Sequence, residues 1–166
     1  MKAHFEMFAA YNAWANRRLH AAAAALPDED RRRDLGAFFG SVHRTLNHLL
    51  VTDVIWLARL RGIPGPRWSL DHVAHDDHAE LTAAREALDA DLIAYVAGLS
   101  EPDLAGEIRY ARVTDPSAVT LQRRAAAMAH LFNHQTHHRG QVHALLTRLT
   151  GEVPALDLLF FQRETA

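Results

Sequence analysis

Apolar residues recur at helical intervals along most of the chain. They are spaced three or four positions apart in four long stretches: residues 3–25, 36–61, 75–99 and 121–149. A residue that commonly ends helices follows each stretch, in chain order Pro27, Gly62, Pro102 and Gly151. The pattern therefore predicts four long helices.

The connection between the third and fourth stretches is long and irregular. Periodicity is lost between residues 100 and 117, and residues 107–113 alternate loosely, which favours a short extended stretch or hairpin. This connection is long enough to cross the bundle. We expect an all-α fold, a four-helix bundle with a long crossover connection, in a single domain of residues 1–166. Residues 155–162 are apolar enough to pack back onto it.

Composition excludes several classes of function. The chain has no cysteine, so disulfides, thiolate metal sites and cysteine nucleophiles are excluded. No basic start precedes an apolar run at the N-terminus, and nowhere do about 18 apolar residues follow one another. We therefore expect a cytoplasmic protein with no membrane partner.

The charge balance argues against a nucleic-acid partner. The formal net charge is −2 and the isoelectric point is near 6.6, so no overall positive field attracts a polyanion. The single basic run, residues 31–33, lies among acidic residues and predicts a solvated, self-neutralising turn.

Histidine is unusually frequent, with 12 in the chain, and residues 129–143 carry five of them. On a helical wheel His138 lies about 40° from His134 and borders the apolar face. His130 and His137 lie at the edge of that face, where they would support the ligands or lie on the surface, and His143 points away. Imidazoles at positions i and i+4 can chelate one metal ion. His134 and His138 are therefore a candidate metal-binding pair.

A third ligand has to come from another helix, and His48 is the candidate. It lies in residues 45–57, which are apolar nearly all round and so predict a buried helix. A buried imidazole needs a hydrogen bond or a metal ion, because an unsatisfied polar group costs about 1–3 kcal/mol. Each histidine could instead be a satisfied core or surface residue, since HxxxH also occurs by chance.

Residues 71–78 form a rival cluster in which histidine and aspartate alternate. No apolar residues surround them to exclude water, so we interpret this stretch as the polar start of a helix, where aspartate suits the helix dipole.

The sequence resembles the DinB-like or YfiT-like family of metalloenzymes, the DNA damage-inducible DinB superfamily. The resemblance covers essentially the whole chain and rests on YNxWAN at residues 11–16, His48 followed by Trp56, NHxxxHRGQ at residues 133–141, and Gly151, Pro154 and Asp157. It implies a four-helix bundle with a long crossover, often dimeric. It also implies one divalent ion, nickel, zinc or iron, on His48, His134 and His138.

Two functional hypotheses follow. The first is a metal-dependent enzyme, a transferase or hydrolase, whose open coordination position activates water or a thiol toward a small-molecule substrate. Some similar proteins use a low-molecular-weight thiol, and without cysteine this chain would need one from outside. The second is a non-catalytic metal- or ligand-binding stress-response module, which a fourth protein ligand such as Asp157 or His130 would favour.

Two further residues of the predicted fourth helix, Gly140 and Gln141, lie close to His138 in the sequence. Gln141 could orient an incoming group or simply pack, and no catalytic residue can be named. Gly140 lies in mid-helix, where glycine costs up to about 1 kcal/mol relative to alanine and usually marks a close backbone approach.

Overall fold

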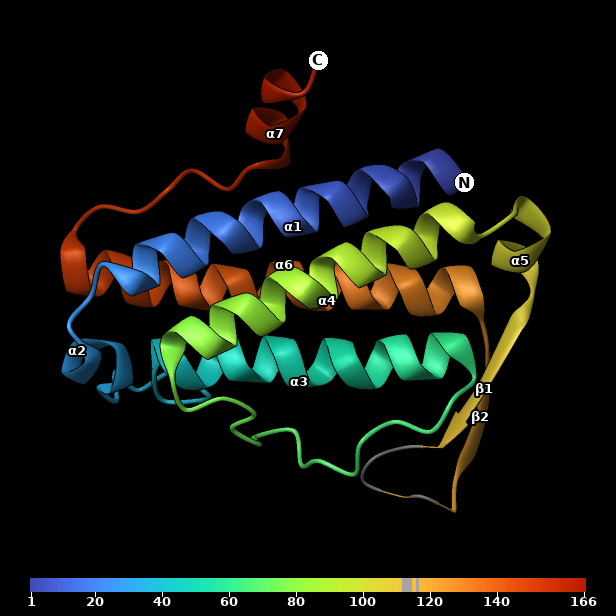
Figure 1. The fold of residues 1–166 in the computed structure, drawn as a ribbon, viewed down its shortest axis with the longest axis horizontal. Helices are drawn as coiled ribbons and strands as arrows, with labels where there is room; N and C mark the ends of the chain where they lie inside the picture. The colour runs from blue at the N-terminus through green and yellow to red at the C-terminus, as the bar shows by residue number, and fades with distance from the viewer. Residues whose placement is uncertain (112–114, 116) are drawn as a thin grey trace.

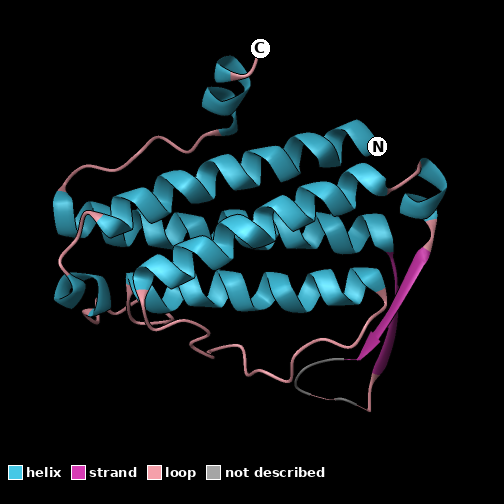
Figure 2. Ribbon diagram, in the orientation of Figure 1, coloured by secondary structure: helices cyan, strands magenta, loops and turns pink. Residues whose placement is uncertain are grey.

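The computed structural model describes residues 1–111, 115 and 117–166. Its four long helices are α1 (Lys2–Ala24), α3 (Val42–Arg61), α4 (His78–Gly98) and α6 (Arg124–Thr150). The shorter elements are α2 (Asp28–Arg32), α5 (Glu101–Ala105), α7 (Leu158–Glu164) and the strands β1 (Glu107–Ala111) and β2 (Val119–Arg123). Figure 2 shows that helices dominate and that the two strands form one hairpin, so the predicted all-α class is confirmed.

The four long helices form a bundle in which α1 packs on α4 and α6, and α3 packs on α6 and α4. In Figure 1, α1 and α6 run in one direction and α3 and α4 in the other. The ends of α3 and α4 therefore lie together, and Tyr95 Oη donates a 2.9 Å hydrogen bond to the Leu60 carbonyl there.

The connection that runs the length of the bundle is residues 62–77, and not residues 100–117 as the sequence suggested. Figure 1 shows it passing back along α3 to the start of α4. The predicted hairpin is present, but it stays at one end of the bundle, where β1 pairs antiparallel with β2. The predicted extended range reached residue 113, and residues 112 and 113 lie outside the described part of the chain.

Three predicted helix starts were too early, and one of them is that of α4, which begins at His78 instead of residue 75. Residues 36–41 are not part of α3, because Gly36 and Gly40 have φ values of 77° and 79° and Ser41 caps the helix by accepting from the Arg44 amide. Residues 121–123 belong to β2 instead of α6, since Leu121 pairs with Arg109 across the hairpin. The predicted glycine stops are confirmed: Gly62 and Gly151 end α3 and α6 in the left-handed conformation.

The basic run is only partly the solvated turn that was predicted. Residues 31 and 32 lie in the short helix α2, and Arg31 is buried. Its Nη1 donates to the carbonyl oxygens of Ala23 (2.7 Å) and Leu26 (3.2 Å), so it satisfies acceptors at the end of α1. Asp28 pairs with Arg31 and Arg32, which agrees with the predicted self-neutralisation.

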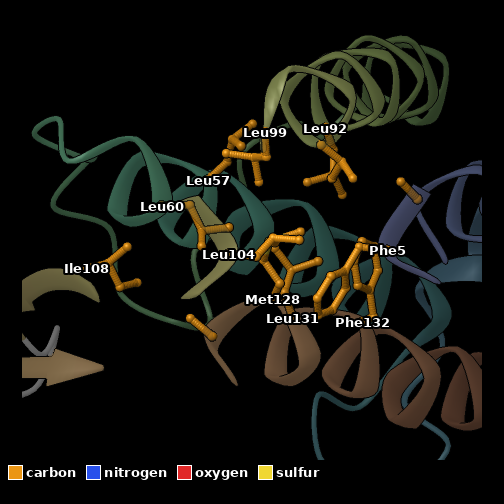
Figure 3. Close-up of a cluster of buried hydrophobic side chains, with 13 residues drawn as sticks. Phe5, Leu57, Leu60, Leu92, Leu99, Leu104, Ile108, Met128, Leu131 and Phe132 are labelled. Carbon is orange, nitrogen blue, oxygen red and sulfur yellow. The ribbon is translucent and has the colours of Figure 1, made fainter. Parts of the chain in front are cut away.

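The apolar core is built from the inner faces of the bundle helices. Figure 3 shows one cluster, in which Phe5, Leu57, Leu92 and Leu131 from the four long helices meet. The C-terminal segment packs back as expected, through Phe161 of α7 against Tyr11 and Trp14. Among the described helices, none has both the length and the apolar character needed to cross a membrane.

Candidate metal centre

His48, His134 and His138 come together in the structure. Each offers one ligand atom, and these atoms all lie within 4.8 Å of one another. His48 comes from α3, and the other two stand one turn apart on α6, where α3 and α6 pack together. The ring centroids of His134 and His138 are 4.4 Å apart, and that of His48 is 5.1 Å from His134 and 4.5 Å from His138.

His48 is held from two sides. Its Nδ1 donates a 2.7 Å hydrogen bond to the Leu70 carbonyl, and its ring stacks on Phe39 with centroids 3.9 Å apart. With the proton on Nδ1, the lone pair lies on Nε2, which faces His134 Nε2 at 3.3 Å. The predicted burial of His48 is confirmed, and the carbonyl supplies the hydrogen bond that a buried imidazole requires.

His138 is oriented in the same manner by a side chain of its own helix. Its Nδ1 donates to Gln141 Oε1 at 2.7 Å, which leaves Nε2 free of its proton. The Gln141 amide nitrogen lies 3.3 Å from His137 Nε2, so the glutamine joins two histidines. The side chain suggested for orienting an incoming group therefore orients a ligand candidate.

All three imidazoles are neutral at neutral pH. Burial lowers the pKa of His48 to about 4 and, with help from the neighbouring histidines, that of His134 to about 3. Burial also lowers the pKa of His138. A metal ion competes with protons for the imidazole lone pair, so rings that stay unprotonated suit a metal ligand.

The donor set fits a divalent transition metal. His134 Nδ1 is buried and has no hydrogen-bond partner among the described residues, so the protein alone leaves this ring incompletely satisfied. With their protons on Nδ1, His48 and His138 each keep a lone pair on Nε2, and the ligand atoms of the three histidines lie within 4.8 Å of one another. Imidazole nitrogens suit zinc, iron and nickel ions alike.

A pocket of about 500 Å³ opens beside the three histidines. Phe38, Phe39 and Leu70 contribute apolar lining, and Asp71, His137 and Gln141 contribute polar side chains besides the three histidines. Phe38, Phe39 and Asp71 lie in irregular segments, and none of them could be assigned to the site from the sequence pattern. The apolar pattern predicts a helix from residue 36, and a helix there would not indicate that the two phenylalanines line a pocket.

The remaining histidines of α6 stay outside the cluster. His130 packs its ring against Trp56 with centroids 4.8 Å apart, and His137 lines the pocket without joining the ligand group. His143 does not line the pocket. Among the described residues, His48, His134 and His138 form the group whose ligand atoms converge, and neither His130 nor Asp157 belongs to it.

The interpretation of residues 71–78 as the polar start of a helix holds only for the last two residues, since His78 is the first residue of α4 and residues 71–76 are irregular. Asp77 caps α4 by accepting from the Glu80 amide at 2.9 Å, and Asp76 pairs with Arg32. The expectation that residues 71–78 are not shielded from water is wrong for His78, which is buried with its ring stacked on that of His20.

The expectation of a close backbone approach at Gly140 is wrong. A Cβ atom built there would meet nothing within 4 Å, because the position faces open space on α6. The glycine therefore has no packing role in the described structure.

A network of buried charges includes Gln135, the residue that follows the ligand candidate His134. Arg85 donates to Asp53 (3.0 Å) and Asp89 (2.8 Å), and Gln135 donates to Asp53 at 2.6 Å. Asn12 and Asn16 of α1 also donate to Asp89. Because Gln135 follows His134 in the chain, the network ties the ligand-bearing turn of α6 to the other three helices.

The chain belongs to the DinB family, whose family model matches residues 1–166. Among solved structures, the chain is similar to a DinB-like protein from Bacillus cereus ATCC 10987. The two share 17% sequence identity with a TM-score of 0.63, and the match covers 85% of this chain and 89% of that chain. This likeness shows a common fold. The search of curated proteins found no match.

Proposed function

We propose that this chain binds one divalent metal ion through His48, His134 and His138 and is a metal-dependent enzyme of the transferase or hydrolase type. The observation that carries the proposal is the convergence of three neutral imidazoles, with ligand atoms within 4.8 Å of one another, beside a pocket. Family membership supports the same reading. Nickel, zinc and iron are all compatible with this donor set.

The number of protein ligands separates the two functional hypotheses. Structural zinc sites are closed by four protein ligands, whereas catalytic sites keep three and leave a position open. Among the described residues the group holds three histidines, and the pocket reaches His48, His134 and His138. This arrangement favours an enzyme over a binding module in which the metal only holds the bundle together.

A divalent ion bound here would lower the pKa of a water molecule or a thiol and so supply a nucleophile near neutral pH. The protein's own part is to fix the imidazoles through Leu70 and Gln141 and to screen them with Phe39. Since the chain has no cysteine, a thiol nucleophile would be a low-molecular-weight thiol. We propose thiol transfer to a small electrophile as the first reaction to test and hydrolysis as the second.

The test compares metal-free protein, metal-loaded protein and metal-treated His138→Ala in the consumption of a small electrophile, with a panel of low-molecular-weight thiols and with water alone. The proposal expects turnover only by the metal-loaded wild type. The matched control is His143→Ala, which removes an imidazole of the same helix outside the pocket and should keep full activity. Equal rates in every sample, with metal bound, would leave the binding module as the function.

A further inference from the structure

A second pocket shares Leu70 with the pocket of the metal centre. Its volume is about 870 Å³, and its walls are the C-terminal half of α3, residues 62–70 and strand β1. Sites for small organic molecules usually measure roughly 300–1,000 Å³, so the space suits such a ligand. We refer to it as the arginine pocket, because Arg59, Arg67 and Arg109 line it.

The charged side chains among the described residues that line the arginine pocket are all positive. No aspartate or glutamate is among the described residues that line it. The ion pairs of the described part of the chain engage other arginines, and none includes Arg59, Arg67 or Arg109. Three guanidinium groups around one concave space, without a carboxylate to balance them, give a local positive potential that attracts anions.

The Arg59 guanidinium is held by two aromatic rings and a backbone carbonyl. Its Cζ lies 4.6 Å from the ring centroids of both Trp56 and Tyr110, and its Nη2 donates to the Ala111 carbonyl at 3.2 Å. The side chain is half-buried, and burial lowers the pKa of its guanidinium. A partly desolvated cation is stabilised by an anion that its fixed donors can reach.

Much of the remaining wall is apolar, and two prolines lie in it. Ile55, Ile63 and Trp68 contribute apolar surface, and Pro64 and Pro66 restrict the backbone of the 62–70 segment. At Gly65 a Cβ atom would lie 3.2 Å from the Cβ of Ala58, so the segment lies directly on α3. A preformed wall lowers the entropy lost on binding.

We infer that the arginine pocket binds a small organic anion, whose carboxylate or phosphate group is held by Arg59, Arg67 and Arg109 and whose apolar body packs on Ile63 and Trp68. Guanidinium groups bind both kinds of anion with paired hydrogen bonds. This site is distinct from the three histidines and does not require a metal ion. The bound anion lies beside the metal centre, since Leu70 lines both pockets and its carbonyl orients His48.

Isothermal titration calorimetry of the full chain tests the inference with four probes: benzoate, phenyl phosphate, neutral benzyl alcohol and inorganic phosphate. Titrations use the protein as purified and again after chelator treatment, at physiological salt. We expect one benzoate or phenyl phosphate per chain with the same affinity in both preparations. Benzyl alcohol and inorganic phosphate should bind at least tenfold more weakly, and the tighter of the two organic anions identifies the preferred head group.

The variants Arg67→Gln and Arg109→Gln should each weaken binding about fivefold or more, and the double variant more strongly. Both side chains are exposed, so their loss should leave the fold intact, which thermal unfolding checks. Arg17→Gln is the matched control, because it removes an exposed arginine of α1 that does not line the pocket.

Three results would overturn the inference. The first is no saturable binding of either organic anion at millimolar concentration. The second is an equal loss of affinity in Arg17→Gln and the pocket variants, which would show only a general charge effect. The third is loss of binding on chelator treatment, which would place the anion on the metal ion instead of the arginines.

Discussion

His48 and His138 are oriented at the centre by different neighbours. The Leu70 carbonyl and the Phe39 ring hold His48, and the Gln141 amide oxygen holds His138. Such contacts fix which ring nitrogen carries the proton and where the lone pair points. The affinity of the site therefore depends on residues that do not touch the ion.

Gln141→Ala should weaken metal binding about 10–100-fold, because loss of the hydrogen bond frees the His138 ring to rotate. Competition with a chromophoric chelator measures the dissociation constant. The exposed Gln162→Ala variant, outside the pocket, should keep the wild-type value. An unchanged affinity in Gln141→Ala would mean that helix packing alone orients His138.

Gly140→Ala should stabilise the protein by about 0.4–1 kcal/mol, since the added methyl group meets nothing and alanine lowers the entropy of the unfolded chain. Gly151→Ala should instead destabilise it by about 1 kcal/mol, because Gly151 has a φ of 74°. Urea unfolding of both variants measures the free energies. Destabilisation by Gly140→Ala would show that the position is tighter than the structure indicates.

The three histidines could be predicted because they lie on regular helices. Periodicity alone puts His134 and His138 on one face, and an all-round apolar neighbourhood marks His48 as buried. Phe39, Leu70 and Asp71 could not be predicted, since they lie in irregular segments whose path depends on tertiary packing. The sequence carries no periodic signal for such segments.

At the scale of elements, the bundle is joined by charged side chains as well as by its apolar core. Arg85 of α4, buried among Asp53 of α3 and Asp89 of its own helix, connects the interior faces. Burial raises the pKa of Asp53 to about 6, although Arg85 opposes this shift. The carboxylates are stable in the core only while the guanidinium faces them.

Arg85→Leu should destabilise the protein by about 3–5 kcal/mol, because it leaves two buried carboxylates without their cation. Arg61→Leu is the matched control: it breaks the exposed pair with Asp91 and should cost less than about 1 kcal/mol. Chemical unfolding of both variants gives the comparison. Similar losses in the two variants would show that the buried network adds no more than a surface ion pair.

The helix stops were predictable and the helix starts less so. Gly62 and Gly151 end α3 and α6 where the sequence predicted, because a left-handed residue after a helix strongly favours glycine. The start of α6 was misplaced because Leu121 pairs with Arg109 in the hairpin, a tertiary contact that overrides local propensity. The short helix α2 was missed, since its five residues are too few for periodicity.

For the whole molecule, the least predictable feature was the connection that makes α3 and α4 parallel. Residues 62–77 contain proline, glycine and polar residues, which indicate a loop and give no direction. This segment places the Leu70 carbonyl against His48 and contributes residues to the lining of both pockets. The crossover therefore helps to build both proposed sites.

Stability should fall as the pH drops below about 6.5, the ordinary pKa of histidine. Burial, with His78 and Arg85 nearby, lowers the pKa of His20 to about 3 in the folded chain. Between these values the unfolded chain binds one more proton, so the free energy of unfolding falls by up to about 1.4 kcal/mol per pH unit from this group as pH decreases.

Urea unfolding between pH 4 and 7 checks this dependence, in buffer without metal. His20→Leu should flatten the curve relative to the wild type, because the variant no longer takes up that proton on unfolding. Parallel curves for the two proteins would contradict a buried neutral His20.

The most direct test of the account is elemental analysis of the protein, purified without affinity resin, together with five single alanine variants. The account predicts about one divalent ion per chain in the wild type, in His75→Ala and in His143→Ala, and loss of stoichiometric metal in His48→Ala, His134→Ala and His138→Ala. Circular dichroism shows whether each variant is folded. Metal retained by folded His138→Ala and lost from folded His75→Ala would contradict the proposed centre.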